Sequence, residues 1–266
     1  MTGFILRIIA MVTMLTDHVG SRFLDNSMAL RSIGRIAFPI YAFLLAEGFL
    51  IFYKKKDRVI KHLSMLISLV VLTEFCYDLF ECGLDFENYM TTQNNIITLL
   101  LGFLGMALTE ALFPMNEKKY DHKFNKWFVL ISTYFMLGVT NLMVKSNYNM
   151  IGPWLVIAFY WFLRLSRDHK TNENIWGYWK RFGFLVLIFA IYLPLYFWFK
   201  KDFCDFSTWL DTMNHYIPWI IGHLGVIIIL SFANGKLGYT SKWFKWIYIS
   251  FYPVHLLILG LIGLVV

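Results

Sequence analysis

Long apolar runs dominate the pattern along the chain. Nine such runs, each about 15–23 residues long, are separated by short polar stretches. A run of this length is sufficient to cross the hydrocarbon core of a bilayer as an α-helix. We therefore expect an all-α polytopic membrane bundle of about nine transmembrane helices (eight to ten), at residues 3–20, 32–53, 59–80, 94–113, 127–144, 150–165, 181–199, 216–233 and 246–265.

The polar stretches between these runs alternate in charge. Four of them are rich in Lys and Arg, at residues 54–61, 114–126, 164–181 and 234–245. The stretches at 82–93 and 145–149 contain only one basic residue in total, Lys145. Lys and Arg gather on the cytoplasmic side of membrane proteins, so the alternation predicts a cytoplasmic N-terminus and a C-terminus on the outer side.

Composition and charge narrow the class of protein further. Apolar residues make up 58% of the chain and charged residues 15%, whereas soluble domains average roughly 45–50% and 25%. Nine spans leave only about 95 positions for loops and tails. We therefore expect one transmembrane domain over residues 1–266, with no separate soluble domain. The net charge of +7 fits inner basic loops facing membrane lipids, so we predict no nucleic-acid partner.

Several ionisable or amide residues fall inside or beside the apolar runs. A charge at mid-membrane costs at least ~2.5–3.5 kcal/mol, so each one needs a structural or functional reason. Many of these residues lie at similar depth in the predicted orientation, which indicates a polar pocket in the outer half of the membrane. The candidates are Arg7, Asp17, His18, Arg35, Glu47, Glu74, Asp78, Asn94, Asn95, His223 and His255.

Some of these charges also allow a purely structural interpretation. Arg31 and Arg35 can neutralise Glu74 and Asp78 and hold two spans together. Glu47, near the inner interface, can serve a structural role or reach the lipid headgroups. Both interpretations stay open on the sequence alone.

Metal and disulfide chemistry receive little support. No pair of histidines and carboxylates has a metal-ligand spacing, so we predict no metal. Cys82 and Cys204 both fall on the predicted outer side. A disulfide between them and two free thiols both remain possible.

Arg7 and His18 form the most informative pair. Eleven residues make three helical turns plus about 20°, so both side chains face the same side, ~16 Å apart. The pantetheine arm of coenzyme A has a comparable length. Its phosphates would lie near the inner basic linkers and its thioester beside His18, which is a suitable base near neutral pH. Because Asp17 is adjacent in sequence, we expect Glu74 or Asp78 to orient the ring.

The spacing from Arg7 to His18 resembles the Arg-x10-His motif of the acyltransferase 3 superfamily, membrane enzymes that move acyl groups from acyl-CoA across the bilayer. More closely, the chain resembles the TraX family, named for the membrane protein that N-acetylates conjugative pilin. The matching segments follow the family order along the whole chain, at residues 8–20, 34–49, 73–79, 95–99 and 251–256.

This resemblance implies a multi-pass protein of the bacterial cytoplasmic membrane. It also implies acetyl-CoA, or another acyl-CoA, as a donor used from the cytoplasmic side. We predict catalytic roles for His18, Asp17, Glu74 and Asp78, and cofactor-binding roles for Arg7, Arg35, Asn94, Asn95 and His255. Acceptor choice is expected to reside in the variable second half, including the outer linker 200–215.

The leading hypothesis is a membrane-embedded acyltransferase in which His18 deprotonates the acceptor. The acceptor would be the N-terminal amine of a membrane-delivered peptide such as a pilin, or an amine or hydroxyl on a surface glycan. Basic residues and the helix start at Asn94 and Asn95 would stabilise the oxyanion. Two alternatives remain: a transporter or channel with a buried polar relay, disfavoured by the lack of a visible internal repeat, and a non-catalytic membrane scaffold.

Overall fold

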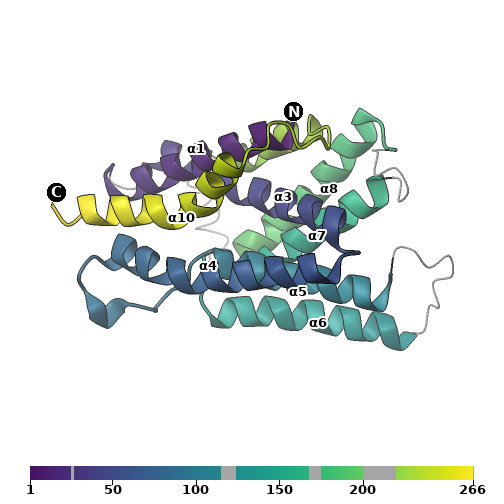
Figure 1. Cartoon of the computed structure of the whole chain (residues 1–266), viewed down its shortest axis with the longest axis horizontal. Coiled ribbons are helices and arrows are strands. Elements are labelled where there is room, and N and C mark those ends of the chain that lie inside the picture. Colours follow the sequence, from purple (N-terminus) through teal and green to yellow (C-terminus); the bar gives the residue numbers. More distant parts are fainter. Residues whose placement is uncertain (25–26, 115–123, 168–174, 200–219, 266) are drawn as a thin grey trace, which may run out of the picture.

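The structure is a computed structural model that describes residues 1–24, 27–114, 124–167, 175–199 and 220–265. Within these ranges the chain forms a bundle of helices joined by turns (Figure 1). The helices are α1 (Gly3–Arg22), α2 (Met28–Gly34), α3 (Ala37–Phe52), α4 (Lys56–Cys82), η1 (Phe86–Asn88), α5 (Ile96–Leu112), α6 (Phe124–Met143), η2 (Asn149–Ile151), α7 (Gly152–Ser166), α8 (Tyr178–Phe199), a helix at Ile220–Ser231 and α10 (Lys242–Ile262).

These helices confirm the predicted all-α membrane architecture. Five helical segments are long and apolar enough to cross a membrane: Gly3–Arg22, Met28–Phe52, Lys56–Cys82, Tyr178–Leu195 and Lys242–Ile262. Helices α5, α6, α7 and the helix at Ile220–Ser231 occupy the remaining predicted spans. Only the start of the span at 216–233 lies outside the described residues. The chain is therefore a multi-pass membrane protein.

The predicted span 32–53 is divided into α2 and α3 by a turn at residues 35–36. Pro39 accounts for the break, because it has no N–H to bond the carbonyl four residues earlier and is tolerated in the first turn of a helix. It occupies the first turn of α3. Both α2 and α3 pack against α1.

The shortest predicted span, at 150–165, lies at the centre of the bundle. Its helix α7 has 15 residues and starts at Gly152, with Pro153 in the first turn, where proline is favoured. Helices α3 and α5 pack on α7. The contacts are aromatic in part, since the rings of Phe43 and Phe159 meet edge to face with centroids 5.7 Å apart. α7 is thus enclosed by protein and does not need a long lipid-facing surface.

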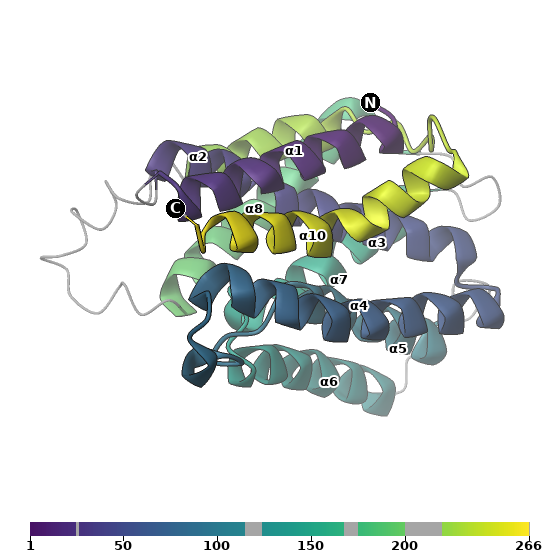
Figure 2. The same ribbon diagram turned by 60° about the vertical axis from the view of Figure 1, so that its left-hand side comes forward.

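Helix α10 lies between α1 and α4 (Figure 2). At the C-terminal end of α4 the two backbones almost touch, because a Cβ built on Gly260 would lie 3.2 Å from backbone atoms of Leu79 and Phe80. Tyr77, Phe80, Leu256 and Leu259 form a small apolar cluster there. Towards the start of α10, the same two helices line a cavity.

The segment before α10 is tied to the start of α1. The amide of Gly3 donates to the carbonyl of Lys236 (2.8 Å), and the amide of Phe4 donates to Leu237 (2.9 Å). These bonds satisfy amides that have no partner within their own helix. They hold the first residues of α10 beside α1 at one end of the cavity.

Candidate functional site

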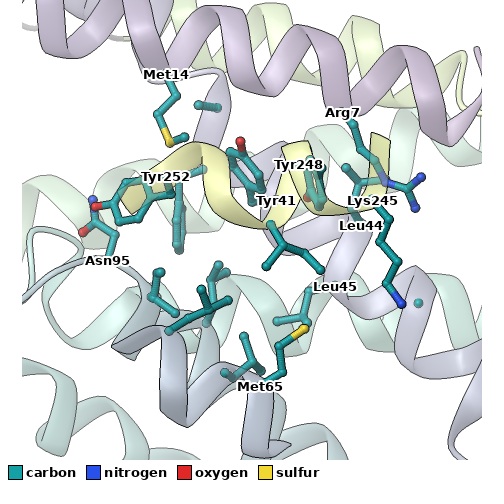
Figure 3. Close-up of a pocket in the computed structure, with 18 of the residues that line it drawn as sticks. Arg7, Met14, Tyr41, Leu44, Leu45, Met65, Asn95, Lys245, Tyr248 and Tyr252 are labelled. Carbon is teal, nitrogen blue, oxygen red and sulfur yellow. The ribbon is translucent and has the colours of Figure 1, made fainter. Parts of the chain in front are cut away.

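A cavity of about 550 Å³ lies between α1, α3, α4, α5 and α10. Figure 3 shows side chains from these helices converging on it. The middle of the cavity is lined by apolar side chains, which would keep water away from a bound ligand. The apolar lining includes Met14, Phe38, Leu44, Leu45, Met65, Leu66, Leu69, Ile96 and Leu99.

The cavity connects a basic end to a polar end. Figure 3 places Arg7 and Lys245 at one end and Asn95 and Tyr252 at the other. His18 belongs to the second end, because its ring centroid lies 6.2 Å from that of Tyr252. Arg7 and His18 therefore line one cavity, as the helical spacing predicts.

His18 is bound by another histidine. It is 8% exposed, and its Nδ1 lies 2.7 Å from Nε2 of His255. The opposite nitrogen of His255, Nδ1, lies 2.6 Å from the carbonyl oxygen of Phe251. The expectation that Glu74 or Asp78 orients His18 is therefore wrong. The physical reason is the packing of α10 between α1 and α4, which delivers an imidazole to this position.

Asp17 lines the cavity beside His18 and faces the arginines of the segment that follows α1. Its Oδ1 lies 3.6 Å from Nε of Arg31 and 3.8 Å from a terminal nitrogen of Arg35. These arginines reach Asp17 because α2 folds back onto α1. The ion pairs of Arg31 and Arg35 at this site are thus with Asp17, where the sequence suggested Glu74 and Asp78.

Glu74 and Asp78 hold the segment between α4 and α5. The Glu74 carboxylate accepts hydrogen bonds from the side-chain amide and the backbone N–H of Asn94, the latter at 3.3 Å. Asn94 Oδ1 in turn accepts from the N–H of Ile96 (2.9 Å) at the start of α5. Asp78 accepts from the N–H of Met90 (3.2 Å).

These contacts give Glu74, Asp78 and Asn94 positions outside the cavity lining. Arg35 and His255 also stand behind the lining rather than in it. Of the residues predicted as a site, the structure brings Arg7, Asp17, His18 and Asn95 onto the wall, with His255 directly behind His18.

Two of the other polar residues noted in the sequence lie elsewhere. His223 is buried against the rings of Phe189 and Tyr192, with centroids 6.1 and 5.9 Å away, and is not part of the cavity lining. Glu47 forms a buried ion pair with Arg167 at 2.5 Å instead of reaching headgroups. The outer linker 200–215, and Cys204 within it, lie outside the described residues.

Residues that the sequence interpretation missed complete the wall. Lys245, Tyr248 and Tyr252 follow one another at spacings of three and four, which places them on one face of α10. Arg7 lies over the ring of Tyr248, 5.4 Å from its centroid, an arrangement that favours a cation. The spacing of three and four residues from Lys245 is the sequence signal that could have identified Tyr248 and Tyr252 as part of the cavity wall.

Two buried polar atoms at the His18 end have no hydrogen-bond partner among the described residues. They are Oδ1 of Asn95 and the hydroxyl of Tyr252. Figure 3 shows the two side chains next to each other at the edge of the cavity. Buried polar groups are normally paired, so unpaired ones at a cavity are available to a ligand.

Comparisons with known proteins identify the family of the chain. No solved structure matches the chain. The chain is 27% identical over 268 residues to a probable fimbrial assembly protein FimC, serogroup H1, of Dichelobacter nodosus, covering 97% of this chain and 94% of the relative. The family described as TraX protein matches residues 2–263. Because that match spans nearly the whole sequence, the chain belongs to the TraX family.

Proposed function

We propose that this protein is a membrane-embedded acetyltransferase. It takes the acetyl group of acetyl-CoA supplied from the cytoplasm and transfers it to an amine, or alternatively a hydroxyl, near the outer half of the membrane. The observation that carries the proposal is the single cavity that runs from Arg7 and Lys245 to His18.

The two ends of the cavity suit the two ends of acetyl-CoA. Arg7, His62, Lys242 and Lys245 all line the basic end, where phosphates would be attracted. The apolar middle suits a thin arm with few charges. The acetyl thioester would then lie beside His18, at the far end from the phosphates.

His18 supports the transfer chemistry as a general base. The acceptor nitrogen attacks the thioester carbonyl while His18 accepts the proton that this nitrogen loses. The tetrahedral intermediate then collapses, the carbon–sulfur bond breaks, and the proton passes to the departing thiolate. The products are an N-acetylated acceptor and free coenzyme A, with no change of oxidation state.

The hydroxyl of Tyr252 would stabilise the negative oxygen of the intermediate. This hydroxyl is buried and lacks a partner within the described chain, so it can donate to a bound carbonyl oxygen. Oδ1 of Asn95, which is also unpaired among the described residues, can only accept and would take a hydrogen bond from the attacking amine or hydroxyl. Asn94 is not available for this role, because its side chain is committed to Glu74, Val70 and the start of α5.

A fimbrial subunit is the acceptor that the comparisons favour. The similar protein of Dichelobacter nodosus carries the description of a fimbrial assembly protein, and TraX-family membership points to pilin. A pilin-like subunit held in the membrane would present its N-terminal amine near the polar end. An amine or hydroxyl of a surface glycan is the alternative acceptor.

Calorimetry on the purified protein in lipid nanodiscs tests the donor. We expect saturable binding of acetyl-CoA that is lost or strongly weakened in Arg7→Ala and Lys245→Ala. Lys126→Ala is the matched control, because Lys126 lies on α6, away from the cavity, and should bind like the wild type.

Transfer to a synthetic peptide with an N-terminal pilin sequence tests the reaction. Labelled acetyl groups should appear on the peptide with wild-type protein and not with His18→Ala. Absence of acetyl-CoA binding would overturn the enzyme hypothesis and favour a transporter, which would show substrate flux without acyl transfer.

A further inference from the structure

We infer that His255 is a positioning residue that fixes the protonation pattern of His18 and directs the basic nitrogen of His18 into the cavity. The inference rests on the proposed function for its catalytic meaning. Its structural content, the identity of the protonated nitrogen, can be tested separately.

The carbonyl of Phe251 determines where the protons lie. A carbonyl oxygen can only accept a hydrogen bond, so Nδ1 of His255, 2.6 Å away, must carry a hydrogen. A neutral imidazole has one N–H, which leaves Nε2 of His255 as an acceptor. Nδ1 of His18 lies 2.7 Å from that acceptor and must therefore be the donor. The remaining nitrogen of His18, Nε2, holds the free lone pair.

The orientation of the rings fits this chain of donors and acceptors. The imidazole planes of His18 and His255 are inclined by only 22°, and the ring centroids lie 4.9 Å apart. This separation is close to the largest that the 2.7 Å contact between the two ring nitrogens allows, so the rings lie end to end and not one above the other. Ring N–H bonds and lone pairs lie in the ring plane, so the hydrogen of one ring points towards the lone pair of the other. Nε2 of His18 forms no hydrogen bond with any described residue, and His18 lines the cavity.

His255 is held in place from several sides. It is 5% exposed, and its ring stacks on that of Phe251 with centroids 4.7 Å apart and planes inclined by 19°. The ring of Phe80 meets His18 edge-on at 5.1 Å. The close contact of Gly260 with α4 fixes the outer part of α10 that carries His255. The geometry of the pair is therefore set by the packing of three helices.

As the hydrogen-bond acceptor for His18, a neutral histidine suits the interior of a membrane protein better than a carboxylate. When His18 takes up a proton, its Nδ1–H bond to His255 becomes charge-assisted and stronger. The pair then carries one positive charge for the duration of the transfer and none at rest. A buried carboxylate would instead leave a negative charge to be compensated in the resting protein.

Nitrogen-15 spectroscopy of the histidine-labelled protein in nanodiscs tests the proton assignment. The signals of His18 are identified among the seven histidines by their loss in His18→Asn. We expect Nδ1 of His18 to be protonated and Nε2 to be unprotonated in the wild type. In His255→Leu, which has no acceptor, this single pattern should be lost.

Kinetics of peptide acetylation test the functional part. A positioned general base contributes ~10²–10⁴-fold to the rate. We expect His255→Leu to lose part of this contribution, so that kcat falls at least tenfold. His255→Gln, whose amide oxygen can accept from His18, should recover most of kcat. The KM for acetyl-CoA should stay unchanged in both variants, because His255 does not line the cavity. Ser250→Ala, an exposed change on the same helix, is the control.

A proton on Nε2 of His18 in the wild type would overturn the inference, as would a wild-type kcat in His255→Leu. Equal loss of kcat in the Gln and Leu variants would also overturn it, by showing a merely structural role. A wild-type protein that transfers no acetyl group would instead overturn the proposed function, while the nitrogen spectra would still decide the proton assignment.

Discussion

Gly34 packs directly on the side chain of Asp17, so closely that a Cβ built on Gly34 would lie 2.1 Å from the Cβ of Asp17. This approach lets α2 lie against α1 and presents Arg31 and Arg35 to the Asp17 carboxylate. The cavity wall around Asp17 therefore depends on the absence of a side chain at one position.

Gly34→Ala should displace either Asp17 or the whole of α2. We expect the free energy of unfolding to fall by about 1–3 kcal/mol, the usual cost of overpacking, and transfer to fall with it. Thermal unfolding in detergent measures the first effect. Gly183→Ala is the control, since a Cβ there meets no atom within 4 Å; equal stability of the two variants would contradict the packing argument.

The buried ion pair between Glu47 and Arg167 should stabilise the bundle from outside the cavity lining. Both residues are almost inaccessible, at 4% and 6% exposure. Glu47→Ala or Arg167→Ala leaves an uncompensated buried charge, which costs about 3–5 kcal/mol. Replacing both with Met should restore much of the loss. Size-exclusion profiles and unfolding midpoints measure the effect, and additive losses in the double variant would refute the coupling.

Tyr252→Phe removes one proposed oxyanion donor without changing the shape of the cavity. We expect kcat to fall by roughly 10²–10³-fold while acetyl-CoA binding stays the same. Tyr239→Phe, at an exposed tyrosine before α10, should leave kcat unchanged. An unaltered kcat in Tyr252→Phe would exclude this hydroxyl from the reaction.

Asp78→Asn distinguishes the structural role of Asp78 from the catalytic role suggested by the sequence. An amide oxygen can still accept the hydrogen bond from the N–H of Met90, so we expect wild-type transfer. Asp78→Leu should destabilise the loop instead, as measured by proteolysis between α4 and α5. If Asp78→Asn lost acetyl transfer as completely as His18→Ala, Asp78 would have a catalytic role and the structural interpretation would be wrong.

The sequence predicted the membrane fold well because span length is dictated by bilayer thickness. It also placed Arg7 and His18 on one wall, because both belong to a single helix whose geometry is fixed. Local rules such as these need no knowledge of how helices pack.

The partners of the charged residues could not be predicted in the same way. His18 and His255 are 237 positions apart, and nothing in the spacing specifies that α10 inserts between α1 and α4. The ion pairs of Asp17 depend on the packing of α2 against α1, which the close approach of Gly34 to Asp17 allows. Tyr252 was overlooked because a tyrosine in an apolar span is equally typical of ordinary packing.

The separation of the two histidines also has a consequence for biosynthesis. At about 5–20 residues per second, the ribosome needs on the order of 10–50 seconds to pass from the codon of His18 to that of His255. During this interval the early helices are already in the membrane, but the imidazole pair does not exist. An interrupted translation product would therefore lack both the imidazole pair and the part of the cavity wall that α10 provides.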